Sequence, residues 1–266
     1  MARNTPPIAL TIAGSDSGGG AGIQADLKTF HQFRVFGTSV ITAVTAQNTV
    51  GVRAWEAMSP AIVTQQLDAV ADDLPPAATK TGMLGSAELV EVVALGIKRH
   101  RLKNYVLDPV MVATSGDRLL HADAARRLAE RLVPLADLVT PNLDEAETLT
   151  GETVRSVEQM EAAGRRLLAM GAGAALVKGG HAAGDTITDV LVTALGVRRF
   201  THRRIATGST HGTGCALSAG VAAGLAHGRP LEQAVSDALD FVQRAIAAAP
   251  RLGAGHGPLD FTQPGT

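Results

Sequence analysis

A glycine-containing turn near the end of the chain carries the residues with the clearest chemical potential. It reads Thr-His-Gly-Thr-Gly-Cys-Ala over residues 210–216, and an alanine- and glycine-rich stretch that predicts a helix follows it. Backbone N–H groups at the start of a helix point toward one spot, and the helix dipole adds partial positive charge there. Gly212, Thr213 and Gly214 are therefore candidates for binding a phosphate, or a phosphoryl group in transfer.

Cys215, the only cysteine of the chain, lies in the same turn. A thiol at a helix N-terminus has a stabilised thiolate, so we expect the pKa of Cys215 to fall below the free value of about 8.5. The turn would then supply a base beside the anion-binding amides. Two plainer interpretations remain open: the glycines only shape a turn, and the cysteine is a small buried apolar residue.

A second candidate group lies at residues 142–145, which read Asn-Leu-Asp-Glu. Asn142 and Glu145 follow a short apolar run and precede a predicted helix, a spacing typical of an N-terminal capping box. The same oxygens suit Mg²⁺, which prefers hard ligands and usually keeps several waters, so one or two carboxylates suffice. Both roles are compatible, and the neighbouring anion-binding turn favours metal binding.

Two charged residues end apolar runs elsewhere in the chain. Asp108 precedes a proline, where it would either support the metal site or serve as a turn residue. Lys178 precedes two glycines, where its ammonium would either neutralise phosphate charge or extend along the surface into solvent. Both pairs of alternatives stay open at the level of sequence.

Two further polar residues are candidates for binding a ring that carries an amino group. Gln47 follows a predicted strand, and its side-chain amide can donate and accept hydrogen bonds at once, which matches an aminopyrimidine edge. Asp26 would accept a hydrogen bond from an exocyclic amine, or it simply lies in the first turn of a helix, where acidic residues are favoured.

Composition excludes several classes of function. The chain has 266 residues, a net charge of -1 and 3% aromatic residues, so it lacks the basic field and the rings that nucleic-acid binding needs. One cysteine excludes an internal disulfide framework and a cysteine-cluster metal site. No apolar run reaches the ~18 residues of a membrane helix, and the first residues make a poor signal peptide. We therefore expect a cytoplasmic protein with no nucleic-acid or membrane partner.

Several common catalytic motifs are missing from the chain. It contains no Walker A sequence, no G-x-S-x-G elbow and no H-E-x-x-H pair. Gly20, Gly22 and Ala25 match the loose dinucleotide fingerprint, but residues 41–50 hold no acidic residue for a ribose. These observations argue against a P-loop enzyme, an α/β-hydrolase and a nicotinamide-dependent enzyme.

Short apolar runs alternate with amphipathic or alanine-rich segments along the whole chain. The runs predict strands at 8–13, 39–46, 52–58, 78–83, 105–111, 138–140, 174–178, 187–193 and 197–205. The segments between them predict helices at 25–33, 60–73, 86–100, 122–132, 143–149, 157–170, 213–227 and 231–249. This alternation is typical of an α/β fold with a mainly parallel sheet and helices on both faces. We expect one domain over residues 1–266, with an irregular tail from about residue 250.

The candidate residues share one position relative to this sheet. In open α/β sheets, ligands bind beyond the carboxyl ends of the strands. The residues that follow predicted strands are 15–22, Gln47, Met83, Asp108, Asn142, Lys178 and Gly212. We therefore expect one site at this edge, and glycine content marks residues 114–117 and 179–186 as candidates for a loop that closes over it.

Five segments carry a resemblance to a known family. They are Ala-Gly-Ser-Asp-Ser-Gly-Gly-Gly-Ala-Gly-Ile-Gln-Ala-Asp at 13–26, Thr-Ala-Gln-Asn-Thr at 45–49, Lys-Thr-Gly-Met-Leu-Gly at 80–85, Leu-Asp-Pro-Val-Met at 107–111, and His-Gly-Thr-Gly-Cys at 211–215. The chain resembles the hydroxymethylpyrimidine/phosphomethylpyrimidine kinases of thiamine biosynthesis over about residues 8–225. Ala216 stands where that family often has a threonine, a difference that touches no proposed role.

The resemblance implies a ribokinase-like α/β fold and two ATP-dependent steps at one site. 4-Amino-5-hydroxymethyl-2-methylpyrimidine would be phosphorylated to its monophosphate and then to its diphosphate. By similarity, Gln47 binds the pyrimidine, and Asp26, Gly14, Met83 and Val110 line its pocket. Cys215 matches the position of the base, whereas Lys178 matches an ATP-phosphate region. Asn142, Glu145 and Asp108 match the Mg²⁺ region, and the family implies a homodimer.

Three alternatives to this function remain. A pyridoxal kinase of the same superfamily would use the same turn for another hydroxymethyl heterocycle, although Gln47 favours the pyrimidine. A non-catalytic pyrimidine-sensing protein would have no need of the intact Gly-Thr-Gly-Cys and Asn-x-x-Glu motifs. A weakly selective kinase for sugars or nucleosides should line its pocket with several carboxylates and amides, whereas Met83 and Val110 indicate a flat apolar ring.

Overall fold

The computed structural model describes residues 5–113, 116–117, 122–180 and 184–265. Residues 114–115 and 181–183, which belong to the two candidate closing loops, lie outside this description. The described helices include none that is both long enough and apolar enough to span a membrane.

The strands of the described chain form one sheet of nine strands, in the order β3-β2-β1-β4-β5-β6-β7-β8-β9. The six neighbouring strands from β2 through β1, β4, β5 and β6 to β7 pair in parallel. β3 at one edge, and β8 and β9 at the other, are antiparallel. The sheet is therefore mainly parallel, as predicted. The strands are β1 (Ile8–Asp16), β2 (Phe36–Gln47), β3 (Val52–Ala57), β4 (Ala78–Thr81), β5 (Tyr105–Leu107), β6 (Leu138–Val139), β7 (Ala174–Val177), β8 (Thr186–Thr193) and β9 (Gly196–Arg203).

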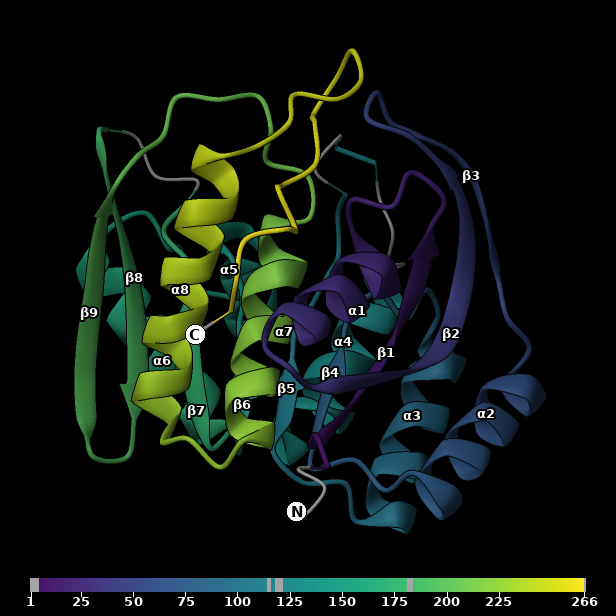
Figure 1. The fold of residues 1–266 in the computed structure, drawn as a ribbon. Helices are drawn as coiled ribbons and strands as arrows, with labels where there is room; N and C mark the ends of the chain where they lie inside the picture. The colour runs from purple at the N-terminus through teal and green to yellow at the C-terminus, as the bar shows by residue number, and fades with distance from the viewer. Residues whose placement is uncertain (1–4, 114–115, 118–121, 181–183, 266) are drawn as a thin grey trace.

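Helices cover both faces of the sheet (Figure 1). On one face, α1 packs on β1 and on α7, and α8 packs on α7. On the other face, α2, α3, α4, α5 and α6 contact one another in succession. The helices are α1 (Gly22–Gln32), α2 (Pro60–Asp73), α3 (Ala87–His100), α4 (Ala122–Arg131), α5 (Leu143–Thr150), α6 (Val157–Ala169), α7 (Thr213–Ala226) and α8 (Leu231–Ala247).

Local sequence explains where several helices begin. Ser59, Ser86 and Ser156 each accept a backbone N–H of the first turn of α2, α3 and α6, and Pro60 occupies the first position of α2, where a missing N–H costs nothing. These caps coincide with the predicted helix starts, because a cap depends on only a few neighbouring residues.

Small residues let α7 lie close to its neighbours. A Cβ atom at Gly220 would lie 2.9 Å from Ala238 Cβ, and one at Gly224 would lie 2.7 Å from Ala234 Cβ, so larger residues would push α8 away. On its other side α7 contacts β1, β4 and β5. This packing places the N-terminus of α7, and with it the glycine turn, at the carboxyl ends of those strands.

Several strand boundaries differ from the prediction, and two of them bear on the site. β1 continues to Asp16 rather than ending at Ala13, because it keeps pairing with β2 beyond an irregularity between Ala13 and Ser15. β5 ends at Leu107 rather than Met111, since Pro109 has no N–H to donate to a neighbouring strand.

Candidate active site

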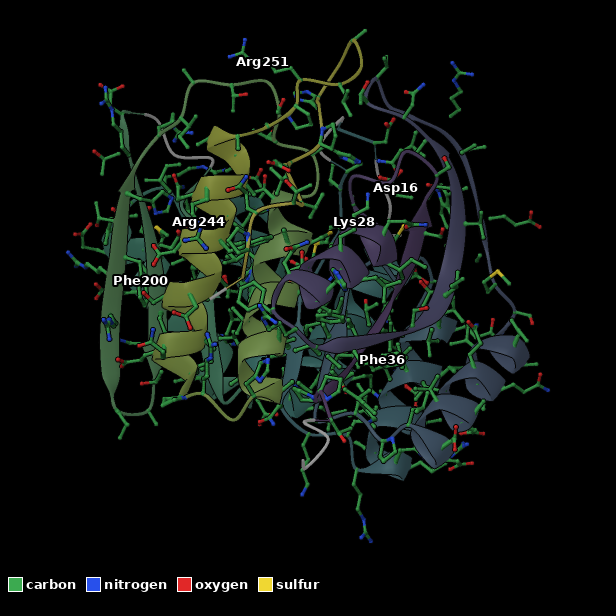
Figure 2. All side chains as sticks on the ribbon, viewed as in Figure 1. Asp16, Lys28, Phe36, Phe200, Arg244 and Arg251 are labelled. Atoms are coloured by element: carbon green, nitrogen blue, oxygen red, sulfur yellow. The ribbon has the colours of Figure 1, made fainter. Side chains whose placement is uncertain are left out.

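A cavity of about 570 Å³ opens at the carboxyl ends of the parallel strands. It lies where the strand order reverses around β1, the position at which open α/β sheets bind ligands. Figure 2 marks Asp16, the last residue of β1, at this upper end of the sheet. Among the sequence-predicted site residues, the cavity wall contains Gly14, Gln47, Met83, Asp108, Val110, Asn142, Glu145, Lys178, Gly212, Thr213, Gly214 and Cys215.

The anion turn, which we define as residues 210–215, depends on a glycine. Gly212 precedes the first residue of α7 with φ +83°, and a Cβ atom there would lie 1.8 Å from the carbonyl oxygen of Gly20. A side chain at this position is therefore excluded by contact as well as by conformation. No side chain caps the first turn of α7, whose residues lie in the cavity wall. The backbone N–H of Thr213 donates to the carbonyl oxygen of Thr210 over 3.3 Å, which leaves those of Gly214 and Cys215 for an anion.

Cys215 lies in the cavity wall, but its acidity differs from our expectation. Burial raises the pKa of Cys215 to about 11, although the charge of Lys80 and a hydrogen bond from the backbone N–H of Gly22 act in the opposite direction. The prediction of a lowered pKa is therefore wrong. Removal from water disfavours the thiolate by more than the helix terminus and the nearby ammonium favour it.

A buried carboxylate, Asp108, connects the anion turn to the neighbouring strands. Lys178 Nζ lies 3.1 Å from Asp108 Oδ1, and the hydroxyl of Ser218 on α7 donates to Asp108 Oδ2 over 3.2 Å. A Cβ atom at Gly214 would lie 3.2 Å from Lys178 Nζ, so the ammonium lies directly beside the anion turn. Lys178 is therefore not a solvated surface lysine.

The charges around Lys178 keep it protonated. Burial alone would lower the pKa of Lys178, but the carboxylates of Asp108 and Glu145 raise it above its usual value. A permanent cation next to the amides of the anion turn is suited to binding phosphate oxygens.

The Asn-x-x-Glu motif forms the predicted capping box at the start of α5. Asn142 Oδ1 accepts the backbone N–H of Glu145 over 2.9 Å, and Glu145 Oε2 accepts the backbone N–H of Asn142 over 2.8 Å. The side-chain oxygen of Asn142 is thus engaged in the cap. Asn142 lies in the cavity wall, where its side chain fixes Glu145.

Glu145 and Asp108 are the carboxylates of the cavity that suit a divalent cation. Burial raises the pKa of Glu145 to about 7, the charge of Lys178 opposes this, and the charge of Asp108 adds to it. A cation beside Glu145 would stabilise the ionised form of its carboxylate. The described residues contain no group of three or more His, Cys, Asp or Glu side chains arranged around a metal. The two carboxylates therefore fit Mg²⁺ that keeps most of its water and shares it with phosphate oxygens.

One end of the cavity is shaped for a flat ring. Ala43 and Met83 form a small apolar cluster with Val110 and Trp55 packed against it. Gly14 faces this cluster, since a Cβ atom at Gly14 would lie 3.1 Å from Met83 Sδ. Gln47 ends β2 in the same wall, with its Oε1 atom 3.3 Å from the hydroxyl of Thr45.

Asp26 does not line the cavity, contrary to our prediction. Its side chain has no exposure, and both carboxylate oxygens lie 2.8 Å from Lys80 Nζ, which is itself in the cavity wall. The hydroxyl of Thr11 donates to the same carboxylate over 2.6 Å. Asp26 occurs early in α1, but it points into the protein interior, where its role is to hold Lys80.

The structure adds polar contacts that the sequence interpretation did not predict, although it had singled out His211 as a histidine beside the anion turn with a structural role. Asp16 and His211 form a buried pair, with His211 Nε2 2.8 Å from Asp16 Oδ2. Asp189 on β8 accepts the backbone N–H of Gly179 over 2.8 Å, and Arg204 donates to the carbonyl oxygens of Gly180 and Gly184. Asp16 lies in the segment 15–22 that follows the first predicted strand, whereas nothing local distinguishes Asp189 or Arg204.

The opposite end of the cavity is an apolar slot between α7 and α8. Leu217, Leu239, Val242, Ile246 and Ile205 line it, and Gln243 is a polar side chain beside them. The anion turn lies between this slot and the Gln47 end. The cavity therefore offers two apolar places suited to rings, joined by a region whose backbone amides and lysine suit an anion.

The chain is similar to known proteins over nearly its whole length. The family model described as phosphomethylpyrimidine kinase matches residues 16–260. A hydroxymethylpyrimidine/phosphomethylpyrimidine kinase from Rhizobium meliloti (strain 1021) is 52% identical over 255 residues, which cover 95% of this chain and 96% of that protein.

Two solved structures share the fold over most of their length. The phosphomethylpyrimidine kinase from Clostridium difficile 630 superposes with a TM-score of 0.81 at 41% identity, covering 90% of this chain and 99% of that one. An ADP complex of Bacillus subtilis pyridoxal kinase superposes with a TM-score of 0.90 at 36% identity, covering 97% and 98%. The ribokinase-like α/β fold is thereby confirmed, and the chain belongs to the phosphomethylpyrimidine kinase family.

Proposed function

We propose that this protein is a kinase that uses ATP to phosphorylate 4-amino-5-hydroxymethyl-2-methylpyrimidine, first to the monophosphate and then to the diphosphate, in thiamine biosynthesis. The observation that carries the proposal is the position of the anion turn between a Gln47 end suited to a small ring and an apolar slot suited to a second ring. Phosphoryl transfer requires mainly positioning and charge neutralisation, and this cavity supplies both.

At the Gln47 end, the pyrimidine ring would lie against Met83 and Val110. The amide of Gln47 would donate to a ring nitrogen and accept from the exocyclic amine. The hydroxymethyl group would then point toward the anion turn and Cys215. This placement requires no carboxylate in the ring pocket, which agrees with the burial of Asp26 beneath it.

At the other end, the base of the nucleotide would occupy the slot between α7 and α8. Its terminal phosphate would reach the backbone N–H groups of Gly214 and Cys215, with the Lys178 ammonium beside them. These groups are fixed before the substrate binds, so they stabilise the charge of the transferred group without reorganising.

Glu145 and Asp108 would hold Mg²⁺ through its water ligands, and Asn142 would act by fixing Glu145. Bound there, Mg²⁺ would neutralise negative charge on the nucleotide phosphates. Lys178 would orient Asp108 through their 3.1 Å ion pair.

The two phosphorylations make different demands on Cys215. The hydroxymethyl oxygen must lose a proton in the first step, whereas the phosphate oxygen that attacks in the second step is already anionic. A thiol that is protonated at rest cannot accept that proton, so base catalysis by Cys215 requires that the thiol first lose its own proton. The proposal therefore links Cys215 to the first step alone.

A coupled ADP-release assay tests the proposed function, with the hydroxymethylpyrimidine, its monophosphate and pyridoxal as parallel acceptors. We expect turnover with both pyrimidines and a lower kcat/KM with pyridoxal. Turnover with pyridoxal alone would reassign the protein as a pyridoxal kinase, an alternative that the likeness to the Bacillus subtilis enzyme keeps in the test. Absence of turnover with every acceptor would favour a sensing protein.

We further propose that the chain acts as a single kinase domain in a cytoplasmic homodimer. The antiparallel pair β2–β3 forms one edge of the sheet, and Val44 of β2 and Val50 in the connection to β3 are half or more exposed. Contact with a second copy would cover these side chains. Light scattering after size-exclusion chromatography measures the mass, and a mass near 27.4 kDa would contradict the dimer.

A further inference from the structure

The turn that follows β1 is organised around one carboxylate. Asp16 Oδ1 accepts the backbone N–H of Gly18 over 2.8 Å, and Oδ2 accepts those of Gly20 and Ala21 over 3.0 and 2.8 Å. We call residues 16–22 the Asp16 turn. Its shape is set by a single side chain that is 3% exposed.

His211 supplies the fourth donor to the same carboxylate. Burial opposes ionisation of Asp16, but the hydrogen bonds from His211 and from the backbone lower its pKa below the usual value. Asp16 is therefore an ionised acceptor, and His211 Nε2 is the donor of the 2.8 Å contact. His211 is itself buried, and its backbone N–H donates to the carbonyl oxygen of Gly257.

The Asp16 turn and the anion turn also touch directly. A Cβ atom at Gly20 would lie 2.5 Å from His211 Cδ2, and one at Gly212 would lie 1.8 Å from the carbonyl oxygen of Gly20. Both glycines are needed for this approach. The position of Gly212, and of the amides after it, is therefore set by the Asp16 turn as well as by α7.

The other side of the Asp16 turn holds the proposed pyrimidine-binding residue. The hydroxyl of Ser17 donates to the carbonyl oxygen of Gln47 and accepts its backbone N–H, both over 2.8 Å. A Cβ atom at Gly18 would lie 3.2 Å from the Gln47 carbonyl oxygen, so these backbones are also in close contact. One turn thus connects Gln47 to His211.

We propose that His211 is a positioning residue for phosphoryl transfer: its hydrogen bond to Asp16 fixes the anion turn at a set distance from Gln47 through the Asp16 turn. The inference rests on the proposed function, because the contact between His211 and Asp16 would set the distance between the acceptor hydroxyl and the transferred phosphoryl group. His211 acts through residues 212–215 and need not touch either substrate.

Two amide substitutions of different length test the role. In His211→Gln the side-chain NH₂ can reach the place of Nε2 and donate to Asp16, whereas in His211→Asn the same group is one methylene too short. We expect H211N to lower kcat for both phosphorylations by roughly 10²-fold, the cost of a displacement of about 1 Å, with little change in the pyrimidine KM. H211Q should recover most of the wild-type kcat.

A further variant tests the contact between the Asp16 turn and Gln47. Ser17→Ala removes both hydrogen bonds to Gln47 and leaves Asp16 and His211 in place. We expect S17A to raise the pyrimidine KM with little effect on kcat, the reverse of the H211N pattern. Equal loss of kcat in H211Q and H211N would mean that the imidazole contacts the phosphates itself, and wild-type kcat in H211N would remove the role altogether.

Hydrogen exchange separates this inference from the proposed activity. Without any substrate, amides of residues 212–215 and of the Asp16 turn should exchange faster in H211N than in H211Q or the wild type. Unchanged exchange would overturn the inference even if the kinase activity is established. If the wild type fails to phosphorylate the pyrimidine while H211N shows faster exchange, the proposed function fails and the structural coupling stands.

Discussion

The carboxylate of Asp26 and the ammonium of Lys80 lie 2.8 Å apart with neither side chain exposed to solvent. Burial raises the pKa of Asp26, although the charge of Lys80 opposes this, so each charge depends on the other to remain in the interior. Because Lys80 also lies in the cavity wall, this ion pair supports the floor of the site.

Breaking this ion pair should destabilise the protein. We expect Lys80→Met to lower the free energy of unfolding by about 3–5 kcal/mol, because it leaves an unpaired buried carboxylate. The pKa of Asp26 in the folded variant then rises further above its unfolded value, so the loss is smallest at acidic pH and grows as pH rises. Urea unfolding at pH 5 and pH 8 measures this. A loss of equal size at both pH values would show that packing and not charge is responsible. The same conclusion would follow if the double variant Asp26→Leu/Lys80→Met were no more stable than Lys80→Met.

Gly212 in the anion turn and Gly228 just after α7 form a matched pair of glycines for testing the turn. Both have positive φ, +83° and +76°, but a Cβ atom would collide with Gly20 only at Gly212 and meets nothing within 4 Å at Gly228. Gly228→Ala should cost about 1–2 kcal/mol of stability through its conformation alone and keep kcat. Gly212→Ala should abolish measurable phosphoryl transfer while the protein remains folded by circular dichroism. Comparable activity in the two variants would contradict the assignment of the anion turn.

Gln47 should control the affinity for the pyrimidine. Gln47→Leu leaves ring donors and acceptors unpaired, which costs about 1–3 kcal/mol, or roughly a 5- to 150-fold rise in the pyrimidine KM. The KM for ATP serves as the internal control, because the proposed nucleotide slot lies at the opposite end of the cavity. Parallel increases in both KM values would indicate a general disturbance of the cavity.

Cys215 should affect the two phosphorylations unequally. With a pKa of about 11, the thiolate fraction rises tenfold per pH unit across the neutral and mildly alkaline range, so the first step should accelerate with pH while the second does not. Cys215→Ala should slow the first step by ~10²–10⁴-fold and remove its pH dependence. Steady-state rates with each acceptor between pH 6.5 and 9.5 provide the measurement. If both steps slow equally, the sulfur acts by packing.

Glu145 should control the Mg²⁺ requirement. Glu145→Gln keeps an N3 residue that can cap α5, but it removes one of the two carboxylates, so the Mg²⁺ concentration for half-maximal activity should rise by about an order of magnitude. Burial raises the pKa of Glu145 above its unfolded value, so wild-type stability falls as pH rises toward about 7, and this dependence should flatten in E145Q. A Mg²⁺ titration and melting curves from pH 4.5 to 8 test both effects. An unchanged Mg²⁺ requirement would place the metal elsewhere.

Local patterns in the sequence were sufficient for most of the fold. Ser59 with Pro60 and the Asn142–Glu145 capping box each define a helix start within a few residues, and the apolar runs define the strands. Hydrophobic periodicity and caps depend on neighbours in the chain, so they can be predicted without knowing the tertiary structure. The alternation of strands and helices then restricts the topology, and the resulting sheet edge brings Gln47, Asp108 and Lys178 into one cavity.

The state of individual charged side chains was decided only by tertiary structure. The family resemblance made Asp26 a candidate pocket residue, but α1 turns it inward onto Lys80 of β4, 54 residues away. The pKa of Cys215 followed burial and not the helix terminus, and Asp16 with His211 joins segments 195 residues apart. Desolvation and long-range pairing depend on which distant elements pack together, and no local pattern in the chain encodes that.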